Sequence, residues 1–288
     1  MTEVALAVDV GATKIAAGRV TSSGELLGRR QIATAGSLSA EELFGSITAL
    51  LDQVRRGDEV VCGAGCAGPI DVLGRVSPLN IPAWREFPLG ERLGATTGLP
   101  SFVNGDAKSL TLAEGWVGTA RGESSFLAMV VSTGIGGGIV LNGRLLDGVE
   151  GNAGHIGHLI VEPEGRVCVC GATGCLEAEA SGLAIEALTG RPPKDAPNDI
   201  RRRTGLLVGR ACASVANLLD LGLCVVSGSV ALGYGEIFFE AAQLELSARA
   251  RLSFSKDARV VPSILGADGP LIGAAAVGWT GLGRSVLG

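Results

Sequence analysis

The sequence predicts an α/β protein built from two similar halves. Strand-like and helix-like segments alternate along its 288 residues, which is the pattern of α/β folds. A strand, a glycine-containing turn and a second strand occur twice, near residues 4–20 and 126–141. Hydrophobic residues make up 47% of the chain, which excludes wholesale disorder, and the length is sufficient for two modest hydrophobic cores. We therefore expect a duplicated architecture with a cleft between the halves.

The first half contains a hairpin, a helix and a buried strand. Apolar residues 4–8 and 15–20 flank a short polar turn, as in a strand–turn–strand unit. Ser39 and Glu42 form a capping-box pattern. It opens a helix with apolar residues at helical spacing: Leu43, Phe44, Ile47, Leu50, Leu51 and Val54. Residues 59–64 are predicted to form a buried strand, and the Pro/Gly-rich residues 65–84 a loop.

The second half repeats this order of elements. We predict a short strand at 102–103, a helix at 106–116 and a hairpin of strands 126–131 and 138–141 around a glycine turn. A polar Pro-rich loop follows at 190–199, then helices at 204–221 and 235–254 and strands at 223–227 and 259–261. The final segment begins as a helix near residue 270.

Composition excludes several classes of protein. The 24 basic and 29 acidic residues give a net charge of −5 without a basic run, so no nucleic acid is expected as a partner. The first residues lack a signal-peptide pattern, and the apolar residues 126–143 are interrupted by glycines, so no membrane partner is expected. We expect a cytoplasmic protein with reduced thiols, of which four in apolar surroundings belong to the core: Cys62, Cys66, Cys212 and Cys224.

Two glycine-containing turns are candidate phosphate-binding loops. In the first, Asp9, Gly11, Thr13 and Lys14 combine free backbone N–H groups with a hydroxyl, a positive charge and a carboxylate that could hold hydrated Mg²⁺. The alternative is an ordinary hairpin. The second turn is richer in glycine and lets a backbone approach a ligand closely; its residues are Thr133, Gly134, Gly136 and Gly137. Neither is a Walker loop, because no Gly-Lys-Ser/Thr follows.

Two further clusters could carry chemistry. Asn104, Gly105 and Asp106 lie at a strand-to-helix junction, where Asp106 could act as a general base or simply as a helix N-cap. Three cysteines crowd into eight residues downstream of the only two histidines: His155, His158, Cys168, Cys170 and Cys175. Three thiolates and one imidazole favour a tetrahedral structural Zn²⁺ site. The alternative is free thiols in a loop.

Taken in order, these motifs resemble the ROK family of repressors, open reading frames and sugar kinases. The most specific element is Cys-x-Cys-Gly-x-x-Gly-Cys-x-Glu at residues 168–177. The resemblance implies the two-domain actin-like ATPase (ribonuclease H-like) fold, an α/β fold with a duplicated βββαβα core and a central cleft. We expect residues 1–105 plus 270–288 to form the smaller domain and residues 106–269 the larger one.

The resemblance also implies a role for each matching position. Asp106 would be the catalytic base, and the zinc ligands would be His158, Cys168, Cys170 and Cys175. The phosphate and ATP contacts would be Asp9, Gly11, Thr13, Lys14, Thr133, Gly134, Gly136, Gly137 and, less specifically, Gly228. The sugar contacts would be Asn104, Gly105, Asp106, His155, His158 and Glu177. The expected cofactors are ATP, transient Mg²⁺ and structural Zn²⁺.

Three positions depart from the family pattern. Gly105 stands where the family has Asn, His155 where it has Glu, and Ala12 where it has Gly. The first two changes remove an amide and a carboxylate that hold sugar hydroxyls, whereas the third is mild.

The expected function is an ATP-dependent kinase for the primary 6-hydroxyl of a hexose, of the glucokinase type. A first alternative is a kinase for a sugar altered at C3, such as the amino sugar kanosamine, or for a cyclitol. A second is a non-catalytic sugar-binding protein of the same fold. A ROK repressor is disfavoured, because the first phosphate loop begins at residue 9 and leaves no room for a DNA-binding domain. A homodimer or homotetramer is expected.

Overall fold

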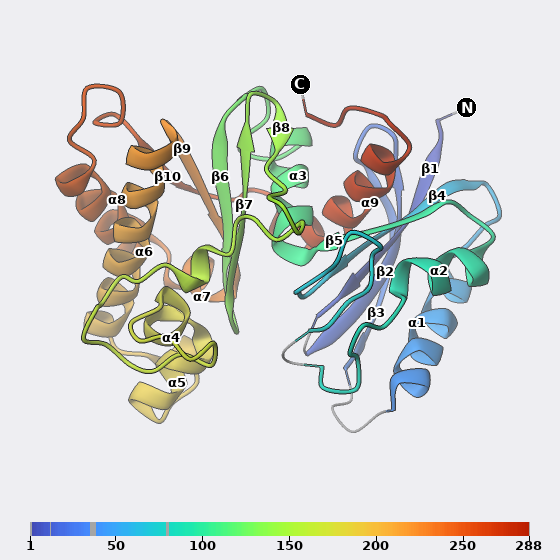
Figure 1. Cartoon of the computed structure of the whole chain (residues 1–288), viewed down its shortest axis with the longest axis horizontal. Helices are drawn as coiled ribbons and strands as arrows, with labels where there is room; N and C mark the ends of the chain where they lie inside the picture. Colours follow the sequence, from blue (N-terminus) through green and yellow to red (C-terminus); the bar gives the residue numbers. More distant parts are fainter. Residues whose placement is uncertain (1, 12, 35–38, 79–80, 288) are drawn as a thin grey trace. The chain divides into compact units, whose positions relative to one another are not determined.

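The computed structural model describes residues 2–11, 13–34, 39–78 and 81–287. These residues form two compact units. Unit 1 comprises Met1–Gly122, Leu145–Ala153 and Ala267–Gly288, and unit 2 comprises Glu123–Arg144 and Gly154–Gly266. Each unit is built on a five-stranded mixed sheet with helices on its faces (Figure 1).

Unit 1 has the strand order β3-β2-β1-β4-β5. The strands are β1 (Val4–Val10), β2 (Lys14–Thr21), β3 (Leu26–Ala33), β4 (Glu59–Cys66) and β5 (Ser101–Gly105). Helices α1 (Ala40–Val54) and α2 (Leu89–Thr97) contribute to the core cluster on one face. Helices α3 (Asp106–Trp116) and α9 (Gly269–Gly281) contribute to the cluster on the other. The apolar stripe predicted for α1 is buried in full, and Ser39 and Glu42 form the predicted capping box.

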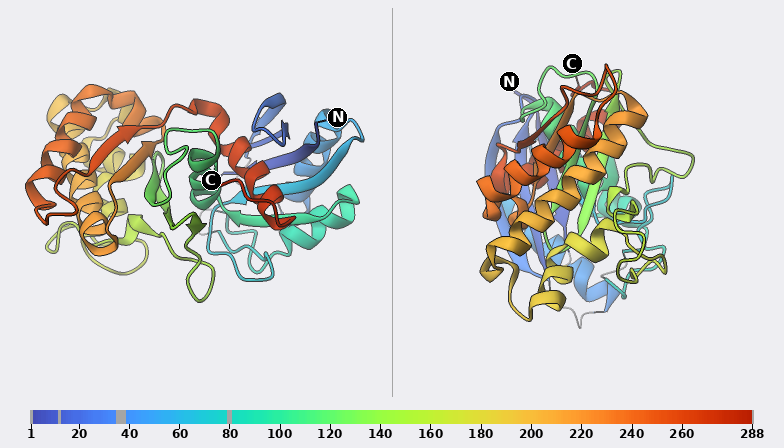
Figure 2. Two further views of the ribbon diagram at one scale, coloured as in Figure 1. Left: turned by 90° about the horizontal axis from the view of Figure 1, so that it is seen from above. Right: turned by 90° about the vertical axis from the view of Figure 1, so that its left-hand side faces the viewer.

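Unit 2 has the strand order β10-β9-β6-β7-β8. The strands are β6 (Phe126–Val131), β7 (Ile135–Leu141), β8 (Arg144–Leu145), β9 (Leu223–Ser227) and β10 (Arg259–Pro262). Helices α6 (Asn198–Leu219) and α8 (Glu236–Arg249) lie side by side along this sheet (Figure 2, right). The shorter elements are η1 (Ile156–His158), α4 (Leu176–Ala180), α5 (Gly182–Thr189), η2 (Pro193–Asp195), α7 (Ser229–Tyr234) and η3 (Gly266–Asp268).

The two sheets share one topology, which confirms the predicted duplication. In unit 1, β1 pairs antiparallel with β2 and parallel with β4. In unit 2, β6 pairs antiparallel with β7 and parallel with β9. Each predicted phosphate turn therefore joins the central strand of its sheet to that strand's antiparallel neighbour.

Several predicted boundaries differ from the structure. Gly136 and Gly137 lie inside β7 and not in the turn, because they pair with Val130 and Met129 of β6. Helix α6 begins at Asn198, within the predicted Pro-rich loop. Helix α8 ends at Arg249, before the predicted residue 254.

The division into units also differs from the expected boundary at residue 105. Helix α3 belongs to unit 1, because it packs on α9 and β4. The approach is close: a Cβ at Gly273 of α9 would lie 2.4 Å from the Ser109 backbone oxygen of α3. The segment Leu145–Ala153 likewise belongs to unit 1 although its chain neighbours on both sides lie in unit 2.

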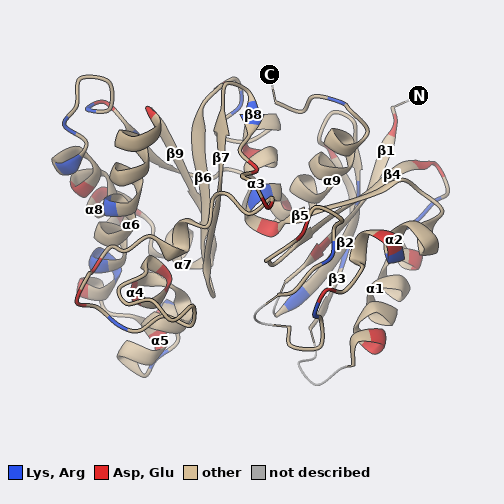
Figure 3. Ribbon diagram, in the orientation of Figure 1, with Lys and Arg blue, Asp and Glu red and all other residues tan. Residues whose placement is uncertain are grey.

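Charged residues on the helices of unit 2 are interspersed in sign (Figure 3). Arg210 and Arg249 both pair with Glu245, and Arg203 pairs with Glu179. Among the described residues, no helix is long and apolar enough to cross a membrane. The four cysteines predicted for the core, Cys62, Cys66, Cys212 and Cys224, are all fully buried.

Candidate active site

Two carboxylates meet at the carboxyl edge of the parallel strands in unit 1. Asp9 on β1 lies opposite Gly65 on β4, which lies opposite Asn104 on β5. Asp106 follows two residues after Asn104. A Cβ at Gly65 would approach the Ser109 Oγ to 3.2 Å and the Asp106 Cα to 3.6 Å. The glycine therefore leaves room for the first turn of α3 beside β4.

The environment of Asp9 disfavours its charged form. Burial is the main cause, and the negative charge of Asp106 adds to it, so the pKa of Asp9 is raised to about 7. Lys14 and Arg29 act in the opposite direction. A cation bound beside Asp9 would favour the carboxylate in the same way, as a nearby positive charge does for any buried acid.

Asp106 is the first residue of α3. The residue in the N-cap position is Gly105, so the simple N-cap interpretation of Asp106 is wrong. The Asp106 Oδ1 accepts a hydrogen bond from the Ala107 N–H at 2.7 Å. Ser109 Oγ donates to the Gly105 carbonyl at 2.8 Å and anchors the turn. The helix N-terminus stabilises a carboxylate there, as a general base requires.

The first hairpin turn is closed by backbone and side-chain hydrogen bonds. The Gly11 N–H donates to the Lys14 carbonyl at 3.0 Å, and the Thr34 hydroxyl donates to the Gly11 carbonyl at 2.9 Å. Thr13 and Lys14 are exposed, so both side chains are accessible to a ligand. Ala12, where the family has Gly, lies outside the described residues.

The second hairpin turn is held by its neighbours in unit 2. The Ser132 carbonyl accepts the Gly182 N–H at 2.7 Å, and the Thr133 carbonyl accepts the Leu183 N–H at 3.2 Å. The Gly228 φ is +102°, and a Cβ there would lie 2.2 Å from the Val131 carbonyl. Gly228, the less specific candidate for an ATP contact, therefore lies directly against the hairpin predicted to bind phosphate.

Glu177 connects the second hairpin to the cysteine-rich segment. One of its carboxylate oxygens, Oε2, accepts the Ile135 N–H at 2.9 Å. A Cβ at Gly134 would lie 3.0 Å from the same oxygen, so the turn approaches Glu177 closely at a glycine. The predicted sugar ligand therefore also helps to fix the predicted phosphate loop.

The two histidines bracket one turn of 3₁₀ helix, with His155 as the N-cap of η1 and His158 as its last residue. The His155 and His158 rings are stacked, with centroids 6.2 Å apart and an angle of 18° between the planes. His155 is exposed and His158 half-buried. The turn lies close to β7 at Gly157, where a Cβ would be 2.3 Å from the Ile135 carbonyl. His155 and His158 thus lie in unit 2, whereas Asn104, Gly105 and Asp106 lie in unit 1.

Four side chains gather in a geometry that suits a tetrahedral metal ion. Donor atoms of His158, Cys168, Cys170 and Cys175 all lie within 4.8 Å of one another. The Cys170 and Cys175 Sγ atoms are 3.6 Å apart, and the Cys168 Sγ is 3.8 Å from the His158 Nδ1. Tetrahedral Zn²⁺ with Zn–S bonds of about 2.3 Å separates its sulfurs by about 3.8 Å. The donor set and its spacing therefore fit Zn²⁺.

Comparison with known proteins finds families, sequences and structures that are similar to this chain. The model of the ROK family matches residues 5–279, nearly the whole chain. The chain belongs to the ROK family. Its sequence and fold are those of the sugar kinases of this family, which confirms the expected resemblance and the two-unit actin-like ATPase fold.

Two relatives indicate the range of the ROK proteins that it resembles. The glucokinase of Thermotoga maritima is 32% identical over 306 residues, covering 94% of this chain and 96% of the relative. The N-acetylmannosamine kinase of Haemophilus influenzae is 36% identical over 247 residues, covering 80% and 82%.

Solved ROK structures match the fold over nearly the full length. A glucokinase from Streptomyces griseus in complex with glucose and AMPPNP superposes with a TM-score of 0.84 at 28% identity, covering 96% of this chain and 99% of that one. The ROK hexokinase of Thermus thermophilus gives a TM-score of 0.80 at 33% identity, with coverage of 97% and 99%.

Some buried residues near the candidate site residues were not predicted from the sequence. Lys108, only 5% exposed, lies two residues after Asp106; its Nζ donates to the Asp147 Oδ1 at 2.6 Å and to the Gly151 carbonyl at 3.0 Å. Glu179 is 2% exposed and pairs with two arginines. For Glu179 the available signal was a charged residue between two alanines in a short helix. Lys108, between Ala107 and Ser109, gave no such signal.

Proposed function

We propose that this ROK protein transfers the γ-phosphoryl group of ATP to the primary hydroxyl of a sugar. The observation that carries the proposal is the placement of Asp106 at the start of α3, with Asp9 across Gly65 at the same strand edge. The bound glucose and AMPPNP of the Streptomyces griseus relative support the choice of sugar and ATP. Phosphoryl transfer needs mainly positioning and charge stabilisation, which glycine turns and carboxylates can supply.

Asp106 would accept the proton of the sugar hydroxyl as that oxygen attacks the γ-phosphorus. The O–P bond to the sugar forms while the bond to the β-phosphate oxygen breaks, and ADP leaves with the electron pair. Asp9 would hold water molecules around the Mg²⁺ that accompanies ATP. Lys14 and the N–H groups of the two hairpin turns would bind the phosphate oxygens.

Zn²⁺, if bound by His158, Cys168, Cys170 and Cys175, would serve as a structural ion. All four positions of a tetrahedral site would then belong to the protein, leaving no open position for catalysis. Cys175 is the N-cap of α4, the helix that carries Glu177. The ion would therefore hold Glu177 and His158 in place for contacts with the sugar. Metal analysis of the native protein should find one zinc per chain.

The substitution Asp106→Asn tests the catalytic role. The variant should fold normally, because Asp106 is not the N-cap and its accepting oxygen is retained in an amide. Its kcat should fall by about 10²-fold or more, as expected when a general base is lost. Asp58→Asn, at an exposed aspartate of the same unit, is the matched control. A variant that retains more than about a tenth of the wild-type kcat would contradict the assignment.

We further propose that the preferred sugar differs from glucose at or beside C3. A Cβ added at Gly105 would meet only Lys108 side-chain atoms, none closer than 3.9 Å. The φ of Gly105 is −55°, so its backbone does not require glycine. The missing amide therefore leaves open space, and the exposed His155 imidazole replaces a carboxylate acceptor. Both features favour a sugar whose substituent at or beside C3 differs from that of glucose, as in an amino sugar such as kanosamine, or a cyclitol with a primary hydroxyl.

An ADP-release assay over hexoses, 2- and 3-amino sugars, N-acetyl sugars and cyclitols would identify the substrate. The native protein should have its highest kcat/KM for a C3-altered compound, and His155→Glu should shift the preference toward glucose. Gly105→Asn adds an independent test at the second position. If the native enzyme prefers glucose tenfold, about 1.4 kcal/mol in transition-state binding, and His155→Glu leaves that ratio unchanged, the specificity proposal is wrong while the kinase proposal stands.

A further inference from the structure

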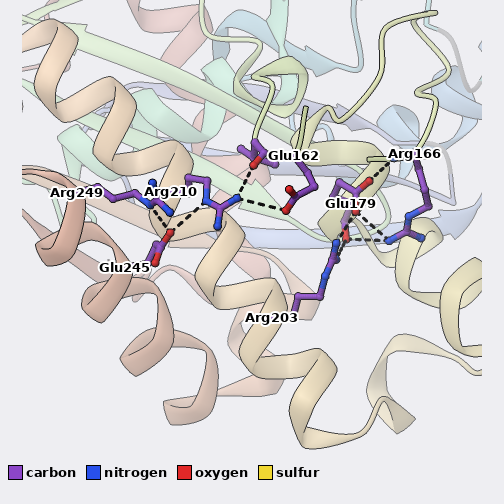
Figure 4. A network of polar contacts seen from close by, with 8 residues as sticks. Glu162, Arg166, Glu179, Arg203, Arg210, Glu245 and Arg249 are labelled. Carbon is purple, nitrogen blue, oxygen red and sulfur yellow. Dashed lines mark hydrogen bonds and ion pairs between the residues drawn. The ribbon is translucent and has the colours of Figure 1, made fainter. Parts of the chain in front are cut away.

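Helix α6 carries two arginines linked to the metal-ligating segment, Arg210 by direct contact and Arg203 through Glu179. We define the metal segment as residues 155–175, which contains His158 and the three cysteines. Arg203 and Arg210 are seven residues apart, which places them on the same face of the helix. Figure 4 shows both side chains extending from α6 toward neighbouring elements. Neither arginine touches a metal donor atom directly in the contacts that the structure shows.

Arg203 acts on the cysteine end through Glu179 of α4. The Glu179 Oε2 accepts from the Arg203 Nη2 at 2.6 Å, while the Arg203 Nη1 donates to the Glu179 carbonyl at 2.9 Å. The Glu179 Oε1 accepts the backbone N–H of Arg166 at 2.6 Å. Arg166 lies two residues before Cys168, so a single carboxylate connects α6, α4 and the start of the cysteine loop.

The contacts of Glu179 favour its charged form. Its side chain is only 2% exposed. Burial raises its pKa, but the hydrogen bonds from Arg166 and Arg203 outweigh burial and hold the pKa below its ordinary value. The Arg166 Nη2 lies 3.3 Å from the Glu179 Oε2 as a second ion pair. Truncation of Glu179 would leave two arginines and one backbone N–H without this acceptor.

Arg210 acts on the histidine end. Its Nη1 donates to the Val161 carbonyl at 2.7 Å, three residues after His158, and its Nε pairs with Glu245 of α8 at 3.1 Å. The two ends of the segment meet at Gly174, whose carbonyl accepts the Val161 N–H at 2.9 Å and whose N–H donates to the Arg166 carbonyl at 2.8 Å. The contacts of both arginines therefore converge beside Cys175.

We propose that Glu179, Arg203 and Arg210 are positioning residues that preorganise the metal segment and, through it, His158 and Glu177. The segment is glycine-rich, with positive φ at Gly171 and Gly174, so four ligands must be ordered for the ion to bind. Groups that orient metal ligands from outside the coordination sphere commonly change metal affinity by about 10- to 100-fold. This inference rests on the proposed zinc site, but not on the identity of the sugar.

The test compares zinc affinity in Glu179→Gln, Arg203→Lys and Arg210→Met with the wild type. Arg202→Ala is the matched control, because Arg202 is an exposed neighbour on the same helix. Competition against a chromogenic chelator should show zinc binding about 10- to 100-fold weaker in the three variants and unchanged in the control. Glu179→Asp, which keeps the charge, should recover part of the affinity.

Thermal denaturation with and without chelator separates positioning from general stability. A positioning role predicts that the difference in Tm between zinc-loaded and zinc-free protein shrinks in each variant. If these residues only stabilise the fold, each substitution would lower the Tm of zinc-loaded and zinc-free protein equally and leave zinc affinity unchanged. That result would overturn the proposal. A wild-type protein that binds zinc but lacks kinase activity would refute the proposed function alone, whereas one that never binds zinc would refute the metal site and this inference together.

Discussion

The coupling between Asp9 and Asp106 can be measured by removing one charge. Asp106→Asn deletes a negative charge that contributes to the raised pKa of Asp9, after burial. The pKa of Asp9 should therefore fall in the variant. It should remain above the ordinary value of 3.8, because the burial of Asp9 is unchanged.

The register of the strands sets the size of this effect. Asp9 and Asn104 are separated by one strand, β4, and neighbouring strands lie about 4.8 Å apart. If the Asp9 and Asp106 charges are taken to lie about 10 Å apart in an effective dielectric constant of about 20, the repulsion between them is about 1.7 kcal/mol. Since one pKa unit corresponds to about 1.4 kcal/mol, the pKa of Asp9 should fall by about 1.

NMR titration of carboxyl carbons in protein labelled with ¹³C at aspartate can follow this change. Asp9→Asn identifies the resonance, and Asp58→Asn serves as a control for an exposed aspartate. The wild type should show a carboxyl that titrates near pH 7, and Asp106→Asn should move that titration to lower pH. An Asp9 pKa that is unchanged in the variant, or ordinary in the wild type, would refute the reasoning.

The same raised pKa has a consequence for stability. The folded protein holds the Asp9 proton up to pH of about 7, whereas the unfolded chain releases it near 3.8. The Asp9 contribution to the free energy of unfolding is therefore favourable at low pH and is lost as pH rises through this window. Asp9→Asn should remove that part of the dependence, as urea denaturation at pH 4.5 and pH 8 would show.

Three further predictions concern packing and local structure. In a denaturation assay, Gly63→Ala should lower the free energy of unfolding by about 3 kcal/mol, because the Cβ of the alanine would lie 1.9 Å from the Ala274 carbonyl oxygen. Gly28→Ala, at a position with open space around it, should lower the free energy of unfolding far less in the same assay. Ser39→Ala should cost about 1 kcal/mol in chemical denaturation through loss of the α1 capping box, and an unchanged midpoint would contradict this. Lys108→Met should lower the free energy of unfolding by about 1–3 kcal/mol, since the Gly151 carbonyl loses its donor. The substitution should also speed hydrogen exchange in Leu145–Ala153. Equal exchange rates in wild type and variant would argue against a role of Lys108 in anchoring this segment.

Much of the fold followed from local patterns. The apolar spacing of α1, the glycine turn after Asp9 and the helix start at Asp106 each depend on a few consecutive residues, and the structure contains all three. Other elements gave no such signal. Strand β3 is mostly exposed and lacks an apolar alternation, and α4 is only five residues long. The glycines of β7 resemble a turn in sequence, but pairing with β6 extends them into a strand.

The metal cluster and the two hairpin turns could be predicted from local sequence, because their members lie within about twenty residues of one another and short chain segments bring them together. The surroundings of the catalytic candidates, in contrast, depend on how distant segments pair and pack. Asp9 and Asp106 are distant in sequence, and the strand order β1-β4-β5 brings them to the same edge of the sheet. The arginines that support the metal segment likewise come from α6. They reach their partners only because this helix packs beside α4. Local hydrogen bonding and apolar periodicity act over a few residues, whereas strand order and helix packing bring together side chains that no sequence spacing relates.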